Sequence, residues 1–221
     1  MTEIFDKIKD NPLFAGIDAG SFGQMLSCVE GRVKLYLKNE LILLAGDPVN
    51  TVGLVISGRA QIVRENTEGK QNLMAELQEG DLFGEVFACA DVSHSPVTVI
   101  AAQDCQVLHL RYKKIITTCP SVCPFHTRLI GNMLTLMAHK NLMLNQKIEI
   151  LSKRTTRERL LLYFEIQRRG ASRFTIPLSR EELAAYLCVE RSAMSAELSR
   201  MQKDGLIRYQ KNEIEWLNSK E

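Results

Sequence analysis

Residues 178–207 read LSREELAAYLCVERSAMSAELSRMQKDGLI, and this stretch decides how the last third of the chain folds. Ser179 is followed three residues later by Glu182, a capping box that predicts the start of a short helix ending near Leu187. A brief turn then leads to a second helix, for which Gly205 supplies a terminating residue. The stretch therefore predicts two helices joined by a tight turn, a helix-turn-helix.

The second of these helices has two chemically different edges. Met194, Leu198 and Met201 recur at intervals of four and three residues and are expected to be buried. The opposite edge is small and polar, with one arginine near the helix start. Such an edge is expected of a helix that lies in the major groove of DNA, where bulky side chains clash and amino-terminal side chains reach base edges. The residues predicted to face the bases are Arg191, Ser192, Ser195, Ala196 and Ser199.

The segments on either side complete a helical module. After the helix-turn-helix, LIRYQK (206–211) and EIEWL (213–217) predict two strands that form a wing around Asn212. Before it, residues 155–168 predict an amphipathic helix. The inward side of that helix carries Leu160, Leu161, Tyr163 and Phe164.

Charge is unevenly distributed along the chain. Residues 1–150 contain 14 Lys and Arg against 16 Asp and Glu, whereas residues 151–221 contain 14 against 10. The net charge is therefore −2 in the first part and +4 in the second, which favours a polyanionic partner for the carboxyl-terminal third. A solvated helix face is the alternative. The densest basic positions are Lys153, Arg154, Arg157, Arg159, Arg168, Arg169, Arg173 and Arg180.

Residues 31–111 predict a β-rich module. Short segments with alternating apolar residues are separated by turns that contain glycine, as at Gly46-Asp47 and Gly80-Asp81. This pattern predicts an antiparallel barrel or a jelly-roll sandwich. The alternating residues include Val33, Leu35, Leu37, Val55 and Ile62.

A long helix is predicted from residue 125 to about residue 152. One apolar stripe has the 4,3 spacing of a heptad seam, which favours pairing with the same helix of a second subunit and hence a homodimer. A second stripe, Leu129, Met133, Leu136 and Met143, is expected to face the β-rich module. An intramolecular core helix is the alternative. The residues predicted at the dimer interface are Ile130, Leu134, Met137, Asn141, Leu144 and Ile148.

The composition is that of an ordinary globular protein, with 45% hydrophobic and 24% charged residues. The opening residues lack the apolar run of a signal peptide, and no uncharged apolar run is long enough to span a bilayer. We therefore expect a cytoplasmic protein that does not contact membranes. The chain has no G-x-S-x-G, P-loop or H-E-x-x-H motif, so an enzyme is not expected.

In the order of its parts, the chain resembles regulators of the Crp/Fnr superfamily over nearly its whole length. The segments around GDLFGE (80–85) resemble the cyclic-nucleotide-binding β-roll, the heptad helix resembles the dimer helix, and residues 178–207 resemble the winged helix-turn-helix. The resemblance implies an α+β fold with an effector domain at 1–122, a dimerisation helix at 123–152 and a DNA-binding domain at 153–221. It also implies a pseudo-palindromic operator and, for an activator, contact with RNA polymerase.

The resemblance is incomplete at the effector site. Members that bind cyclic AMP follow Gly-Glu with an Arg-Ser-Ala segment, whose arginine pairs with the ligand phosphate. This chain keeps Gly84-Glu85 but has Ser95-Pro96-Val97 at the matching stretch, so no cation is available there. We therefore expect that cyclic AMP does not bind tightly and that the effector is another small molecule. Residues predicted to line its pocket are Gly84, Glu85, Ser95, Pro96, Lys140 and Asn145.

The recognition helix departs from the family pattern too. Arg191 is kept and can form a forked pair with guanine, but Ser192 stands where the family has glutamate and Ala196 stands where it has a later arginine. The preferred operator should therefore differ from the familiar TGTGA type. Phosphate contacts are predicted for Arg180, Arg200 and Lys203, with simple surface solvation as the alternative.

Six cysteines are spread along the chain, and reduced thiols are the default expectation. Iron–sulfur members of the superfamily that the chain resembles carry a cysteine cluster near the amino terminus. This chain has no such cluster before Cys28, so an iron–sulfur cluster is not expected. The segment TTCPSVCPFH brings Cys119, Cys123 and His126 close in sequence, and Pro124 predicts that the long helix begins there. Thiol-redox sensing by Cys119 and Cys123, metal binding with His126, and plain packing all remain open, as does a module that acts mainly through a protein partner.

Overall fold

The computed structural model describes residues 2–66, 70–117 and 123–217. The chain divides into two compact units, Met1–Ala138 and His139–Glu221. No helix within the described ranges combines the length and the apolar character that crossing a bilayer requires.

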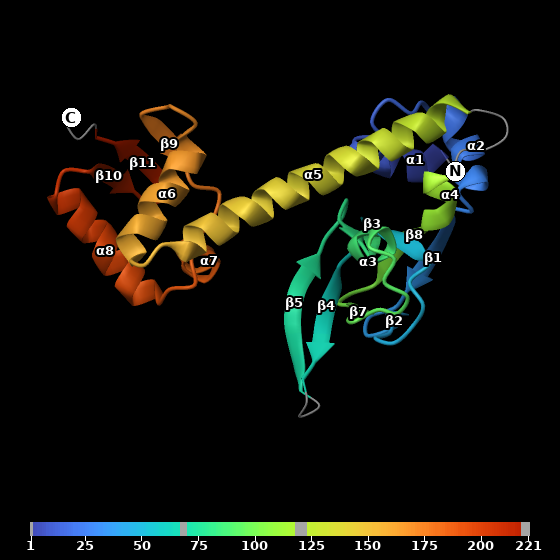
Figure 1. Cartoon of the computed structure of the whole chain (residues 1–221), viewed down its shortest axis with the longest axis horizontal. Coiled ribbons are helices and arrows are strands. Elements are labelled where there is room, and N and C mark those ends of the chain that lie inside the picture. Colours follow the sequence, from blue (N-terminus) through green and yellow to red (C-terminus); the bar gives the residue numbers. More distant parts are fainter. Residues whose placement is uncertain (1, 67–69, 118–122, 218–221) are drawn as a thin grey trace. The chain divides into compact units, whose positions relative to one another are not determined.

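The first unit contains two antiparallel four-stranded sheets, which confirms the predicted jelly roll (Figure 1). In one sheet the strand order is β1-β8-β3-β6, and in the other it is β2-β7-β4-β5. The first sheet consists of β1 (Arg32–Tyr36), β8 (Cys105–Arg111), β3 (Thr51–Ser57) and β6 (Leu82–Phe83). The second consists of β2 (Leu41–Leu43), β7 (Thr98–Ala101), β4 (Ala60–Glu65) and β5 (Gln71–Leu77).

In the first strand, the apolar residues of the alternating pattern are not the residues that are buried. Val33, Leu35 and Leu37 are exposed, and Tyr36 is the buried residue of β1. Strand β3, by contrast, is buried from Val52 through Ile56, because its TVGLVI sequence is almost continuously apolar. The strand prediction is therefore confirmed, and the structure adds that the apolar side of β1 is exposed.

Short helices pack against the first sheet of the jelly roll. Their side chains fill a core that also contains Leu108 and Leu110 of β8. The predominantly β prediction for this unit did not include the amino-terminal helices. The helices are α1 (Thr2–Ile8), the 3-10 helix η1 (Pro12–Phe14), α2 (Ala19–Cys28), α3 (Glu85–Cys89) and α4 (Tyr112–Ile116).

The long helix α5 runs from Pro124 to Ser152 and begins at the proline, as predicted (Figure 1). Leu129 and Met133 are buried in the core of the first unit, which agrees with the predicted second stripe. Met143 lies in the second unit and is exposed in the single chain. Whether Met143 faces the β-rich module stays a prediction.

The second unit contains the predicted helical module (Figure 1). Helices α6, α7 and α8 pack around a core that includes Phe164, Leu183 and Met194. The wing hairpin is extended to a three-stranded antiparallel sheet, β10-β11-β9, by a strand that the sequence pattern did not predict. The elements are α6 (Thr156–Arg168), β9 (Arg173–Thr175), α7 (Arg180–Tyr186), α8 (Arg191–Lys203), β10 (Ile207–Gln210) and β11 (Glu213–Trp216).

Candidate nucleic-acid interface

Helix α8 has one buried edge and one exposed edge, as its sequence predicts. Met194, Leu198 and Met201 are at most 1% exposed. Because these residues hold the helix against the core, the opposite side is left to solvent. All five residues predicted to face bases lie on the exposed side: Arg191, Ser192, Ser195, Ala196 and Ser199.

Two of the serine hydroxyls on this exposed side, those of Ser195 and Ser199, are hydrogen-bonded within the chain. Ser195 Oγ donates to the carbonyl of Arg191 at 2.9 Å, and Ser199 Oγ donates to the carbonyl of Ser195 at 3.1 Å. Arg191 forms an ion pair with Glu181 at 3.1 Å, and both side chains are largely exposed. Exposed pairs of this kind contribute little stability, so Arg191 is available to exchange its partner for a base edge.

The capping box that starts α7 is formed as predicted. Ser179 Oγ accepts a hydrogen bond from the Glu182 amide at 3.2 Å, and the Glu182 carboxylate accepts one from the Ser179 amide at 2.7 Å. The amide of Ser179 and its side chain hold the pKa of Glu182 below its ordinary value. Helix α7 therefore begins at a defined residue, which fixes where the turn to α8 begins.

Arg159 of α6 donates hydrogen bonds to the turn between α7 and α8. Its Nη1 donates to the carbonyl of Leu187 at 3.0 Å and to that of Cys188 at 3.4 Å. Cys188 has a positive φ of 51°, a conformation that costs energy for a residue with a side chain. Arg159 offsets part of this cost by satisfying the turn carbonyls, so it supports the helix-turn-helix from inside the unit.

Helix α8 is also anchored to α6 by an ion-pair network. Arg157 pairs with Glu197 at 2.5 Å and with Asp204 at 2.7 Å, and Arg200 pairs with Glu197 at 2.9 Å. The hydrogen bond from Arg157 lowers the pKa of Glu197, and the bond to Glu197 raises the pKa of Arg157. The network adds polar contacts between α6 and α8 beside the apolar contacts of the buried side. Sequence reasoning missed its link to α6 because Arg157 lies far along the chain from Glu197 and Asp204.

The three residues predicted to contact phosphate differ in their surroundings. Arg200 and Lys203 are exposed near the end of α8. Arg180 is half-buried instead: its guanidinium donates to the Lys211 carbonyl at 2.7 Å and lies over the ring of Tyr209. Burial lowers the pKa of Arg180 from its ordinary value. The side chain therefore joins α7 to the wing, and a phosphate contact from it stays a prediction.

Several of the basic residues that make this part of the chain cationic have partners inside the unit. Arg168 pairs with Glu165 at 2.7 Å, and Arg173 pairs with Glu215 at 2.9 Å. Arg157, Arg159 and Arg180 likewise have partners within the unit, so all five side chains make contacts that hold the fold together. Net charge alone therefore overstates how many cations are available to a polyanion.

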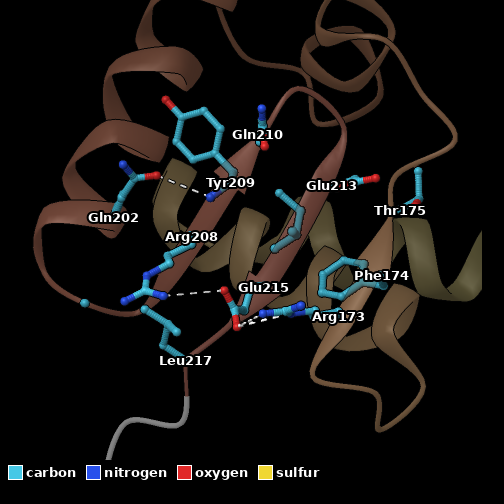
Figure 2. A pocket seen from close by; sticks show the side chains of 12 residues that line it. Arg173, Phe174, Thr175, Gln202, Arg208, Tyr209, Gln210, Glu213, Glu215 and Leu217 are labelled. Carbon is cyan, nitrogen blue, oxygen red and sulfur yellow. Dashed lines mark hydrogen bonds and ion pairs between the residues drawn. The ribbon is translucent and has the colours of Figure 1, made fainter.

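An open hollow of about 860 Å³ lies on the wing sheet beside the end of α8 (Figure 2). Gln202 of α8 accepts a hydrogen bond from the Tyr209 amide at 3.2 Å, which ties the helix end to β10. Arg173 and Arg208 both point toward Glu215, as Figure 2 shows. The wing therefore presents a mixed-charge surface next to the recognition helix.

Two family models match the chain. A cyclic nucleotide-binding domain matches residues 33–120, and a Crp-like helix-turn-helix domain matches residues 158–221. Together they cover well over half of the chain, in the order that the fold shows. The chain belongs to the Crp/Fnr superfamily of transcription regulators. It is a DNA-binding regulator of that type, with a β-roll, a long helix and a winged helix-turn-helix.

Relatives of known name agree with this assignment. The cyclic AMP receptor protein of Thermus thermophilus is 26% identical over 205 residues, which are 91% of this chain and 90% of that protein. The transcriptional activator protein FnrA of Stutzerimonas stutzeri is 23% identical over 189 residues, 82% of this chain and 75% of that protein. The crystal structure of the catabolite activator protein of T. thermophilus has a TM-score of 0.53 at 24% identity and covers 93% of each chain. These relatives belong to a non-enzymatic family, as expected.

The family's effector-site positions are partly occupied by structural groups in this chain. Gly84 has a left-handed φ of 77° and precedes α3, and Glu85 is buried. Ser95 is buried and its Oγ donates to the Val97 carbonyl at 2.7 Å, whereas Pro96 is exposed. Lys140 and Asn145 are on α5 in the second unit, where Asn145 donates to Asn141 at 2.8 Å. A role in effector binding stays a prediction for all six residues.

The predicted cysteine corner is only partly described. Cys119 lies outside the described residues, so its relation to Cys123 stays a prediction. Cys123 is half-buried, and His126 is buried in the first turn of α5. The structure adds a third residue that the sequence pattern did not predict, Cys28 at the end of α2.

Proposed function

We propose that this Crp/Fnr regulator acts as a homodimer whose two α8 helices read successive major grooves of a pseudo-palindromic operator. The observation that carries the proposal is the exposure of the small, polar side of α8 opposite a fully buried apolar side. A helix in the major groove needs such a surface, because base edges are reached by short or forked polar side chains.

Dimerisation through α5 is the second part of the proposal. Along the predicted seam, Leu134, Leu144 and Ile148 are 65%, 60% and 64% exposed in the single chain. Apolar side chains at heptad spacing are seldom left to solvent, and pairing with the same helix of a second subunit would bury them. Asn141 lies in the same seam and accepts a hydrogen bond from Asn145 of the same helix, and a polar residue at a seam position suits a role in setting register and oligomeric state.

The proposed operator differs from the family's familiar one at a definable position. Arg191 would pair with guanine through both of its terminal nitrogens, while Ser192 has no carboxylate to accept a hydrogen bond from cytosine. The exposed Arg200 and Lys203 would contact phosphates and contribute affinity that does not depend on sequence. If the regulator is an activator, RNA polymerase is a further partner. The proposed site of action is the cytoplasm.

The effector in this proposal is a small molecule other than cyclic AMP. The T. thermophilus relative is named a cyclic AMP receptor protein, but this chain has Ser95-Pro96-Val97 where an arginine would meet the cyclic phosphate. Leaving that phosphate unpaired in a buried site costs several kcal/mol. Calorimetric titration with cyclic AMP should therefore show no binding at micromolar concentrations. Saturable micromolar binding would refute this part of the proposal.

The proposed signal path runs through the hinge between α5 and α6. Residues 153–155 lie outside both helices, and Thr155 caps α6 with its side chain. A signal in the effector domain (1–122) that shifts the dimerisation helix (123–152) would change the orientation of the DNA-binding domain (153–221) at this hinge. The population of dimers whose recognition helices match both half-sites would change with it.

Gel-shift titration over a range of salt concentrations tests the DNA-binding proposal. An operator is first selected from random duplexes, and its affinity is then measured with rising salt. The logarithm of the affinity should fall linearly with the logarithm of salt, with a slope of about −0.9 per phosphate contact. A partner-binding module would give no selected duplex and no such slope.

A further inference from the structure

Three residues with metal-binding side chains converge where α2 ends and α5 begins. The thiol sulfurs of Cys28 and Cys123 and one imidazole nitrogen of His126 all lie within 4.8 Å of one another. Cys28 is the last residue of α2, Cys123 immediately precedes α5, and His126 is in the first turn of α5. All three belong to the first unit, so their arrangement is independent of where the second unit lies.

His126 is the observation that points to a ligand. Its side chain is only 3% exposed, and neither ring nitrogen has a hydrogen-bond partner among the described residues. A buried polar atom that is left without a partner lowers stability, and native proteins seldom tolerate it. Phe125 lies beside the imidazole, with ring centroids 5.3 Å apart, and offers it no hydrogen bond. A metal ion is a partner that a buried neutral imidazole can bind.

The elements that hold these residues are firmly anchored. Met25 of α2 and Leu129 of α5 are fully buried in the same core. Asn132 of α5 donates hydrogen bonds to the carbonyls of Leu13 and Ala15, at 2.9 and 3.0 Å, just before α2. The amide of His126 donates to the carbonyl of Cys123 at 3.0 Å, which holds the first turn of α5 in place. The metal-binding atoms are therefore brought together by the fold before any ion arrives.

We propose that Cys28, Cys123 and His126 bind a thiophilic divalent cation of the zinc class. Tetrahedral zinc, with Zn–S of about 2.3 Å and Zn–N of about 2.0 Å, keeps its ligand atoms roughly 3.3 to 3.8 Å apart. Atoms already within 4.8 Å of one another need only small rotamer changes to reach this spacing. Thiolate and imidazole ligands favour zinc, cobalt or iron(II) over magnesium or calcium, which prefer oxygen.

Binding deprotonates both thiols and releases their two protons to solvent, so affinity should rise with pH. Three protein ligands leave a fourth position for water or another small ligand, an arrangement that zinc sites use when they must exchange a ligand. Occupancy would tie the end of α2 to the start of the dimerisation helix. The inference goes beyond the proposed DNA-binding function and does not depend on it, because the binding is measured on the free protein.

Cobalt(II) titration of the reduced, metal-free full chain tests the proposal. We expect saturation at one ion per chain, with thiolate-to-cobalt charge-transfer absorption that zinc abolishes by displacement. Magnesium and calcium should produce no displacement. Absence of the charge-transfer band at saturating cobalt would overturn the proposal.

Variants assign the ligands. Each of three single variants should weaken cobalt binding by more than about 100-fold: Cys28→Ser, Cys123→Ser and His126→Gln. Loss of a residue that only hydrogen-bonds to a metal ligand typically weakens binding by about 10- to 100-fold, so a larger loss identifies a ligand. Cys188→Ser is the matched control, because Cys188 is an exposed cysteine in the second unit. The affinity of this variant for cobalt should equal that of the unmodified chain. Undiminished binding by the Cys28→Ser variant would contradict the proposed site and would favour a site made by the 119–126 segment alone.

X-ray absorption spectroscopy of the zinc-loaded unmodified chain gives a result that does not depend on whether the variants fold. The account predicts two sulfur ligands near 2.3 Å together with imidazole scattering. A coordination sphere that contains only nitrogen and oxygen, or four sulfurs without imidazole, would overturn the proposal.

Discussion

Arg191 is the residue on which sequence reading depends most in the proposed complex. It lies at the first position of α8, and its partner Glu181 is itself exposed. The variant Arg191→Ala should lose about 1–3 kcal/mol of discrimination at one base pair of each half-site. Competition assays with single-base operator variants measure this loss directly.

The matched control for Arg191 is the variant Lys203→Ala. Lys203 is exposed at the other end of α8, and its predicted contact is a phosphate. This variant should weaken all duplexes equally and reduce the magnitude of the salt slope by about two, because each dimer loses two phosphate contacts of about 0.9 each. If Arg191→Ala behaved in the same way as Lys203→Ala, Arg191 would not read a base.

His109 gives the β-roll a pH-dependent stability. Burial, together with nearby Lys34, lowers the pKa of His109 from 6.5 to about 4, and Tyr36 shares a 2.9 Å hydrogen bond with the imidazole. The folded chain therefore binds fewer protons than the unfolded chain between these two pH values. As far as His109 is concerned, the free energy of unfolding is highest above about pH 6.5. It decreases as the pH falls from there toward about pH 4, because the unfolded chain then binds a proton that the folded chain does not.

The expected loss between about pH 7.5 and about pH 5 is about 2 kcal/mol from this one group. Urea unfolding at the two pH values measures it, and the difference should shrink by that amount in His109→Gln. His139→Gln is the control, because His139 is exposed on α5. An equal pH dependence in the unmodified chain and in His109→Gln would show that His109 does not carry the effect.

At the residue scale, the sequence correctly predicted which side chains of α8 are exposed. It did not predict which arginines have intramolecular partners. The 4,3 spacing of Met194, Leu198 and Met201 determines the buried side of a helix, and the rest follows from geometry. Arg157 and Arg159 are basic in sequence but are bound to Glu197 and to turn carbonyls in the fold. Their partners are distant in the chain, so no local pattern reveals them.

Among the elements, the capping box at Ser179 makes the start of helix α7 testable. The box at Ser179 satisfies amides that would otherwise face water or the core, so Ser179→Ala should lower the free energy of unfolding by about 1 kcal/mol. Ser172→Ala is the control, because no side-chain hydrogen bond is described for the exposed Ser172. Thermal or urea unfolding measures both, and equal values would mean that the cap carries no stability.

The elements were predictable where local chemistry specifies them. Proline at residue 124 and the serine and threonine caps mark helix starts, and the structure has helices beginning at those points. Strand β1 shows the limit: its alternation is real, but the side that carries Val33 and Leu35 lies outward. Which side of an edge strand is covered depends on neighbours elsewhere in the chain, and alternation alone does not contain that information.

Helix α5 makes a prediction about assembly. The double variant Leu144→Glu with Ile148→Glu places charge on the exposed seam and should raise the dimer dissociation constant by more than about tenfold, since each buried Leu or Ile contributes about 1.5–3 kcal/mol. Sedimentation velocity measures the change. Gln146→Glu is the control on the opposite side of the helix and should leave the dimer intact. Equal dissociation constants for the two proteins would place the dimer interface elsewhere.

For the whole molecule, the order of the parts was more informative than any single part. A β-roll, a heptad helix and a winged helix-turn-helix, in that order, indicated the superfamily, and the two family matches confirm it. The signal was not predictable in the same way. An effector is recognised by side chains from several strands and helices, and Cys28 joins Cys123 and His126 only after the chain has folded.

The most direct test of the central claim is hydroxyl-radical footprinting of the selected operator, combined with the mass of the complex in solution. The account predicts two chains per duplex and two protected half-sites whose centres are about 34–36 Å apart, one helical turn or a multiple of it. One chain bound to an unsymmetrical site, or no bound duplex even at low salt, would contradict the assignment of α8 as a dimeric recognition helix.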